Sequence, residues 1–409
     1  MAKAKNPVET RTPVGALYIH IPFCNQICSY CDFPKVSLQG QDTDAYLTAL
    51  IEELAIYEKT VGFAKLQTIY IGGGTPTALT TKQLDRLFTY LHSIINFHHL
   101  VEVSIEANPE SLTDIEKIAC LKRNGITRIS LGVQTFQEKH LQILERSHSK
   151  KEACEVIALL SKENFEINLD LIYGIPTETL KDWEKDLDIL LQLPITHVSA
   201  YSLIVEEHTK LYIDHMKNKL ELIDNEIEAQ MFELAIDKLT EAGFEHYEIS
   251  NFTKNNRSTH NVMYWKNEYY IGVGLGAHGH LEVEKILKSE NTSIAQEIIN
   301  GNNSTRYENT RSMTAYKKAL KTGELPVLKA QALTREEQIE ESMFLGMRLM
   351  EGVNLNQLQA KYQVNIYELY KPKLDKLRDL GYVSLESGVL RLTRKGLMIA
   401  NNVFEEFLL

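Results

Sequence analysis

The chain has 409 residues and a formal net charge of −11, so it is long enough for about two or three domains and too acidic for a general nucleic-acid binder. It contains no run of ~18 apolar residues that could span a bilayer, and Met1–Pro7 has no apolar signal core. Its five cysteines show no paired pattern, which fits a reducing compartment, so we expect a soluble, cytoplasmic protein that does not bind nucleic acid.

Apolar, β-rich runs alternate with helix-period segments along the first half of the chain. Six strands are predicted, at Ala16–Ile21, Leu66–Ile71, Val101–Ile105, Arg128–Leu131, Glu166–Leu171 and His197–Leu203. Helical stretches between them include Asp44–Tyr57, Leu84–Ile95 and Leu180–Leu191. Because such alternation builds parallel sheets, we predict an α/β fold with an open, partial (β/α)6 barrel; a full eight-unit barrel is the alternative.

The alternation stops after Leu203. A helical segment is predicted over 225–242, followed by a stretch rich in glycine and aromatic residues over 246–280. Residues 282–309 are polar and are interpreted as a linker or surface helices.

The C-terminal part of the chain is predicted to be an α+β domain that resembles a winged helix. Tyr382–Leu385 and Val389–Thr393 form a short hairpin around Glu386-Ser-Gly, between helical segments. Residues 329–409 carry eleven basic and eleven acidic residues, so no net positive field would attract a phosphate backbone. We favour a structural or partner-docking role, and we divide the chain into domains at 1–245, 246–327 and 328–409.

Three cysteines at the end of the first strand have the spacing C-x3-C-x2-C: Cys24, Cys28 and Cys31. A ferredoxin-type [4Fe-4S] cluster uses four cysteines, so a three-cysteine loop would leave one iron open for S-adenosylmethionine (SAM). A structural zinc site or free thiols are the alternatives, but structural zinc prefers four closed ligands and no second knuckle follows. The remaining cysteines, Cys120 and Cys154, are interpreted as buried small side chains.

The ends of the later strands carry residues whose chemistry suits a bound sulfonium nucleoside. The second strand runs into Gly72–Thr75, where backbone groups can approach a ligand closely. Glu106 could take ribose hydroxyls or an ammonium group, and Arg146 could hold a carboxylate with its planar fork. Gln134 and Asp170 stand at corresponding strand ends. Each could also be an ordinary turn or surface residue; their shared position at the ligand-binding edge favours a site.

Five motifs together resemble one family: Tyr18-Ile-His-Ile-Pro-Phe-Cys, the cysteine triplet, Gly-Gly-Gly-Thr-Pro-Thr, Ser-Ile-Glu-Ala-Asn-Pro-Glu and Asp-Leu-Ile-Tyr-Gly-Ile-Pro. This is the radical SAM superfamily, specifically the oxygen-independent coproporphyrinogen III oxidase group. The resemblance implies that Cys24, Cys28 and Cys31 hold a [4Fe-4S] cluster and that Tyr30 lies beside the adenine. It further implies a SAM pocket lined by Tyr18, Gly73, Gly74, Thr75, Glu106, Gln134, Arg146 and Asp170.

Two features distinguish branches of that family. Phe33 stands where the oxidases have a fourth cysteine, as in the HemW-like branch of haem chaperones. The run His260-Asn261-Val-Met-Tyr264-Trp265 matches the H-N-x-x-Y-W motif of the same branch. By its chemistry His260 could be an axial haem ligand beside aromatic surfaces, although a buried core histidine is the alternative.

The resemblance implies a haem-binding protein that transfers haem to client haemoproteins, including respiratory proteins at the membrane, where it would bind peripherally. It also implies a homodimer that depends on the cofactors. The second hypothesis is an enzyme that cleaves SAM to a 5′-deoxyadenosyl radical and decarboxylates coproporphyrinogen III. The third hypothesis is a transcriptional regulator, which would need a basic recognition surface that the composition does not show. Whether the protein is an enzyme at all stays open at this stage, and no catalytic residue is assigned.

Overall fold

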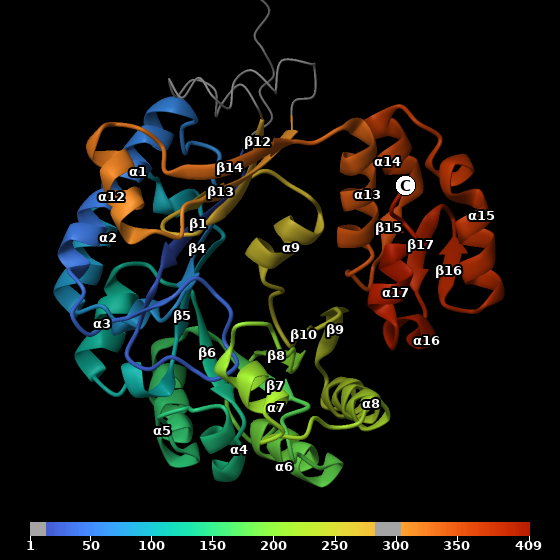
Figure 1. Cartoon of the computed structure of the whole chain (residues 1–409), viewed down its shortest axis with the longest axis horizontal. Helices are drawn as coiled ribbons and strands as arrows, with labels where there is room; N and C mark the ends of the chain where they lie inside the picture. The colour runs from blue at the N-terminus through green and yellow to red at the C-terminus, as the bar shows by residue number, and fades with distance from the viewer. Residues whose placement is uncertain (1–13, 283–303) are drawn as a thin grey trace, which may run out of the picture.

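The computed structural model describes residues 14–282 and 304–409, and most of the predicted linker lies outside these ranges. Within them, seven adjacent strands run parallel and form the centre of a twelve-stranded sheet (Figure 1). Their order is β11 (Tyr270–Val273), β1 (Ala16–Ile21), β4 (Thr68–Gly73), β5 (Glu102–Ala107), β6 (Arg128–Gln134), β7 (Glu166–Tyr173) and β8 (His197–Ser202).

Antiparallel strands extend the sheet on both sides. They are β10 (Asn251–Thr253) and β9 (Glu245–Glu248) beside β8, and β12 (His278–Glu282), β13 (Ser304–Asn309) and β14 (Val327–Ala332) beside β11. Within the described ranges the edge strands β9 and β14 do not pair with each other. The barrel is therefore open and partial, as predicted, and the closed eight-unit alternative is excluded.

Most of the helices cover the outer face of the sheet, whereas α9 (Thr259–Trp265) packs on its inner side, where His260 contacts Thr68 of β4 (Figure 1). In chain order the helices are α1 (Thr43–Thr60), α2 (Thr81–Ile94), α3 (Ile115–Arg123), α4 (Glu138–Ile143), α5 (Lys150–Leu160), α6 (Leu180–Leu190), α7 (Lys210–Met216), α8 (Asn225–Glu241), α9 and α12 (Met313–Lys321). Capping boxes start α2, α5 and α6, where a Ser or Thr exchanges hydrogen bonds with the Gln, Glu or Asp three residues later. No helix in the described ranges is both long and apolar enough to cross a membrane.

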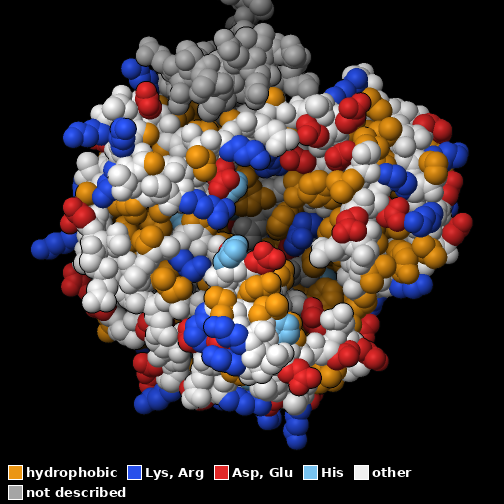
Figure 2. Space-filling model, viewed as in Figure 1, with side chains coloured by type: hydrophobic (Ala, Val, Ile, Leu, Met, Phe, Trp, Pro, Cys, Tyr) orange, Lys and Arg blue, Asp and Glu red, His pale blue; other side chains and the backbone are white. Residues whose placement is uncertain are grey.

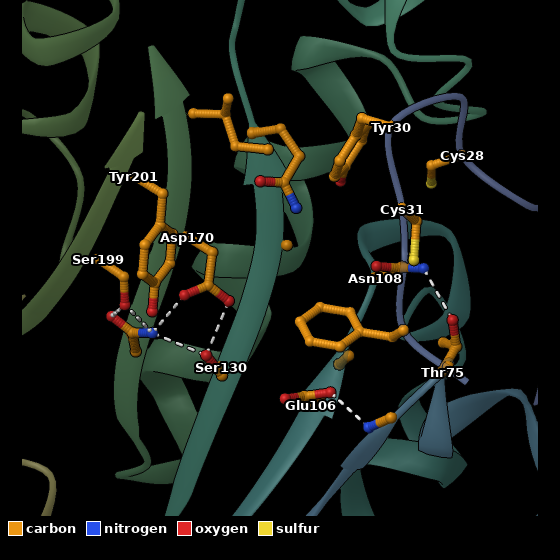
Figure 3. A pocket seen from close by; sticks show the side chains of 18 of the residues that line it. Cys28, Tyr30, Cys31, Thr75, Glu106, Asn108, Ser130, Asp170, Ser199 and Tyr201 are labelled. Atoms are coloured by element: carbon orange, nitrogen blue, oxygen red, sulfur yellow. Dashed lines mark hydrogen bonds between the residues drawn. The ribbon is translucent and has the colours of Figure 1, made fainter. Parts of the chain in front are cut away.

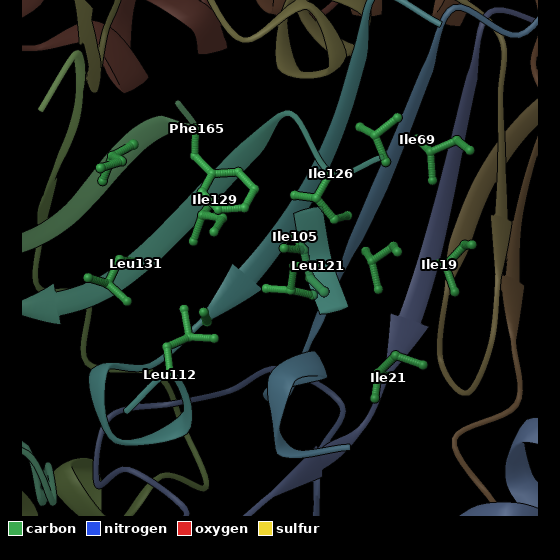
Figure 4. Close-up of a cluster of buried hydrophobic side chains, with 14 of the residues drawn as sticks. Ile19, Ile21, Ile69, Ile105, Leu112, Leu121, Ile126, Ile129, Leu131 and Phe165 are labelled. Carbon is green, nitrogen blue, oxygen red and sulfur yellow. The ribbon is translucent and has the colours of Figure 1, made fainter. Parts of the chain in front are cut away.

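Alternation along each parallel strand decides what faces the helices. In β6, Ile129, Leu131 and Val133 belong to the main buried cluster. Ile19, Ile69 and Ile105 of neighbouring strands join it, as Figure 4 shows. The intervening positions are free to carry polar side chains, which therefore face the inside of the barrel.

Buried Glu53 of α1 ties the strands and helices around β11 together. Its carboxyl accepts hydrogen bonds from the Gly274 amide at 2.8 Å, Asn309 Nδ2 at 2.7 Å and the Tyr316 hydroxyl at 2.5 Å. Burial raises the pKa of Glu53 to about 7. One carboxyl thus joins α1 to the chain after β11, to β13 and to α12.

Residues after β14 build a smaller unit with its own core. It contains α13 (Arg335–Gly346), α14 (Leu355–Tyr362), α15 (Ile366–Asp379), α16 (Arg394–Leu397), α17 (Ala400–Glu405) and a sheet of β15 (Val353–Asn354), β17 (Val389–Leu392) and β16 (Val383–Glu386). The predicted hairpin is confirmed: β16 and β17 pair antiparallel. Arg348 of this unit reaches back to the buried Glu248 of β9, with 3.6 Å between Nη2 and Oε2.

Candidate functional site

A cavity of about 450 Å³ occupies the inside of the partial barrel. This volume lies within the range of ordinary small-molecule sites. Its lining runs from the cysteine loop and the carboxyl ends of the strands down to Arg128 and His197, the first residues of β6 and β8. Figure 2 shows a hollow near the centre of one face, bordered by apolar side chains. The cavity therefore spans the full length of these strands.

The cysteine loop is fixed in place at one end of this cavity. Cys24 ends the short strand β2 (Phe23–Cys24), which pairs with β3 (Val36–Ser37), and Cys28 and Cys31 follow in the loop. Ser29 anchors the loop to the end of α4: its amide donates to the Leu144 carbonyl at 3.2 Å and its hydroxyl to the Ile143 carbonyl at 2.8 Å. All three cysteines line the cavity, and burial raises the pKa of Cys24 to about 11. Without a metal the Cys24 thiol stays protonated at neutral pH.

The donor set fits an iron–sulfur cluster better than a single metal ion. Among the residues that the structure describes, no group of three or more His, Cys, Asp or Glu side chains is placed to hold one metal ion. A cubane cluster spreads its thiolates over different irons, so its ligands need not meet at one point. Gly74 leaves room beside the thiol, because a Cβ there would lie 2.8 Å from Cys24 Sγ. Arg146 Nη1 lies 3.3 Å from Cys28 Sγ and supplies positive charge next to this sulfur atom.

Glu106 and the glycine turn after β4 form one wall. Glu106 accepts hydrogen bonds from the Gly73 amide at 2.8 Å and the Tyr70 hydroxyl at 3.0 Å. Burial raises the pKa of Glu106 to about 7. Gly73 has φ of 117°, and a Cβ there would lie 2.5 Å from the His20 ring, so this turn requires glycine.

Asp170 stands on the opposite wall, as Figure 3 shows. Its carboxylate accepts hydrogen bonds from the Ser130 hydroxyl and from Asn168 Nδ2, each at 2.8 Å. Burial raises its pKa. Arg146, at the same end as the cysteines, donates to Asn108 Oδ1 at 2.8 Å and to the Gly132 carbonyl at 2.6 Å. The cavity thus has a carboxyl group on each side and a guanidinium beside the thiols.

The structure brings most of the predicted site residues into the lining of one cavity. These are Cys24, Cys28, Tyr30, Cys31, Gly73, Gly74, Thr75, Glu106, Gln134, Arg146 and Asp170. Tyr18 and His260 are not part of the lining. The Tyr18 ring instead stacks on that of Tyr70, with 6.2 Å between centroids.

His260 lies behind the lining and is fully buried. Its Nδ1 lies 2.8 Å from Thr68 Oγ1 and its Nε2 lies 2.7 Å from the Tyr264 hydroxyl. Its ring is 5.2 Å from that of Tyr70, which does line the cavity. In this arrangement neither imidazole nitrogen is free to bind iron, so ligation would require Tyr264 to release Nε2.

None of the polar residues at the floor of the cavity belongs to the predicted site. They are Arg128, Ser130, Asn168, His197, Ser199, Tyr201, Ser258 and Asn261. The signal was present in the sequence, because every second residue of β6, β7 and β8 is polar or glycine over these positions. Ser258 caps α9 and Asn261 lies within it, so the H-N-x-x-Y-W segment reaches the floor.

Two family models match this chain, one within the part that builds the large sheet and one within the C-terminal unit. A family model described as "Radical SAM superfamily" matches residues 18–190, and one described as "HemN C-terminal domain" matches 333–399. Proteins named "Heme chaperone HemW" from Lactococcus lactis and Bacillus subtilis are each 38% identical to this chain. The Lactococcus alignment covers 97% of both chains, and the Bacillus alignment covers 96% of this chain and 98% of its relative. The solved coproporphyrinogen III oxidase HemN of Escherichia coli superposes with a TM-score of 0.78 at 21% identity, over 97% of this chain and 90% of that one, which shows a shared fold.

Proposed function

Because this chain belongs to the radical SAM superfamily and, within it, to the family of proteins named heme chaperone HemW, we propose that it binds haem and transfers it to client haemoproteins. The observation that carries the proposal is identity of 38% over nearly the whole length of two such chaperones. Phe33 in place of a fourth cysteine and the His260–Trp265 motif support the same branch.

Membership of the radical SAM superfamily implies a [4Fe-4S] cluster and SAM as cofactors. In our proposal Cys24, Cys28 and Cys31 hold the cluster, which when bound can supply an electron to the sulfonium of SAM. Glu106 and the Gly73–Thr75 turn hold the amino-acid end of SAM, whose other contacts come from Tyr18, Tyr30, Gln134, Arg146 and Asp170. His260 remains the proposed haem ligand, reached once Tyr264 moves.

We extend the proposal to organisation and location. Three domains at 1–245, 246–327 and 328–409 would act together in the cytoplasm, and the C-terminal domain would dock a partner. Clients would include respiratory haemoproteins at the membrane, where the protein would bind peripherally. A homodimer would form only with the cofactors bound.

One experiment separates the chaperone from the oxidase. The cluster is reconstituted anaerobically, and the protein receives haem in one sample and coproporphyrinogen III with SAM and reductant in another. We expect a shifted haem Soret band at about one equivalent and no decarboxylated porphyrinogen. Decarboxylated product would instead make the protein an oxidase, despite Phe33.

The raised pKa of Glu106 predicts that SAM binding depends on pH. An ionised carboxylate attracts the ammonium of SAM, whereas the protonated form does not, so binding requires deprotonation of a group with pKa about 7. Between pH 8 and pH 6 we expect the affinity of the reconstituted protein for SAM to fall by about tenfold, approaching one decade per pH unit below 7. Isothermal titration calorimetry at each pH measures this affinity. Glu106→Gln should bind SAM weakly and with a flat profile; a flat profile in the wild type would contradict the role of Glu106.

A further inference from the structure

Arg128 stands at the floor of the barrel cavity with part of its guanidinium unused. It is the first residue of β6, is only 4% exposed, and lines the cavity together with Ser258 and Asn261. Its Nη2 donates to the carbonyl oxygens of Asn256 at 2.9 Å and Arg257 at 3.3 Å. Its Nε and Nη1 are buried and have no hydrogen-bond partner.

Glu102 lies close enough to balance the charge of Arg128 but does not satisfy these donors. Nε is 3.8 Å from Glu102 Oε2, beyond hydrogen-bond distance. The Glu102 carboxylate is already engaged, because it accepts from the Ser104 and Ser258 hydroxyls and from the Thr259 amide. His197 also lines this floor, and burial, with a smaller contribution from the charge of Arg128, lowers its pKa well below its usual range. Its neutral ring offers no counter-charge.

A buried guanidinium with unmade hydrogen bonds is costly, so such a group in a cavity points to a missing partner. A guanidinium N–H donates a charge-assisted hydrogen bond to a carboxylate or phosphate oxygen, and of these two anions haem carries only carboxylates. Arg128 donates to the two carbonyls that precede α9 through Nη2 alone, so Nε and Nη1 remain available to a ligand.

We propose that Arg128 binds a carboxylate of the ligand that occupies the floor of the barrel cavity; for haem, the group would be a propionate. The identity of the ligand rests on the function proposed above. The fold connects this carboxylate contact to the proposed iron ligand. Arg128 holds the backbone of Asn256 and Arg257 immediately before α9, the helix that carries His260 and Asn261. Metal ligand and propionate contact would then lie at the same end of the barrel.

The test compares haem with its dimethyl ester, which keeps the iron and the macrocycle but has no free carboxylate. Both are titrated against wild type, Arg128→Gln and Arg128→Lys, with the Soret band as the readout. Arg86→Gln, at a partly exposed arginine of α2, is the matched control. We expect wild type and the control to prefer haem over the ester by about tenfold or more. Arg128→Gln should bind both equally, with its affinity for the ester unchanged.

Each other outcome is decisive. Equal binding of haem and ester by the wild type would overturn the proposal, as would a preference that survives in Arg128→Gln. A purely structural arginine would instead weaken haem and ester alike. If Arg128→Gln fails to fold, Arg128→Lys decides: an ammonium keeps the charge but cannot place a donor where Nε and Nη1 lie, so the preference for haem should fall, and an undiminished preference overturns the proposal. A wild type that binds the ester but not haem would refute only the carboxylate-binding role of Arg128. A wild type that binds neither would refute the proposed haem function itself.

Discussion

Alanine at Cys24, Cys28 and Cys31 together should abolish the brown iron–sulfur absorbance of the reconstituted protein. The three thiols line one end of a single cavity on a loop anchored to α4, and no other group of protein ligands in the described ranges could take their place. We expect iron and sulfide content to fall to background, measured by absorbance and by elemental analysis after anaerobic reconstitution.

The chain provides its own controls for this experiment. Cys120 is buried in α3, where its thiol lies 3.3 Å from Asp85 Oδ1, and Cys154 is half-buried in α5. Alanine at either position should leave the absorbance unchanged. One equivalent of zinc in the wild type, with no iron or sulfide, would refute the cluster assignment.

Haem binding should respond in opposite directions to two substitutions in α9. His260→Ala removes the proposed ligand and should weaken haem binding by tenfold or more, on the order of the loss of one strong interaction. Tyr264→Phe removes the hydroxyl that occupies Nε2, so it should strengthen haem binding by up to about tenfold. Soret titration measures both, and the cluster absorbance should be unchanged in both variants.

A second buried histidine offers a matched comparison. His280 of β12 is also hydrogen-bonded at both ring nitrogens, to Ser304 and to the Glu268 carbonyl, and it does not line the cavity. His280→Ala should therefore leave haem affinity as in the wild type. If His260→Ala behaves in the same way, His260 is not in the haem site.

The central strands could be predicted because each is a continuous run of apolar, β-rich residues between turn signals. All six predicted strands are present, with ends that differ by a few residues. β11 could not be found in this way. It is only Tyr270–Val273, contains a glycine, and is recognisable as a strand only by its parallel register with β1, far away in the sequence. Local patterns do not contain information about such a pairing.

The candidate site divides along a similar line. Residues at strand ends, such as Glu106 and Asp170, could be predicted because parallel strands present these ends at one edge. The placement of His260 behind the lining could not, since it follows from side-chain partners on β4 and within α9. Arg128 was not predicted, because the prediction considered only the carboxyl ends of the strands. Alternate residues face inward along the whole strand, and Arg128 is the first of these in β6.

The position of β1 also bears on how this protein is made. β1 lies between β4 and β11 in the sheet, so one of its neighbours is synthesised soon after it and the other only after most of the barrel. While the chain emerges from the ribosome, the β11 side of β1 is therefore an unpaired strand edge, next in sequence to the cysteine loop. Pairings between such distant segments slow folding and leave edges open to aggregation. The nascent chain thus carries its cluster ligands next to an unpaired strand edge until β11 has been synthesised.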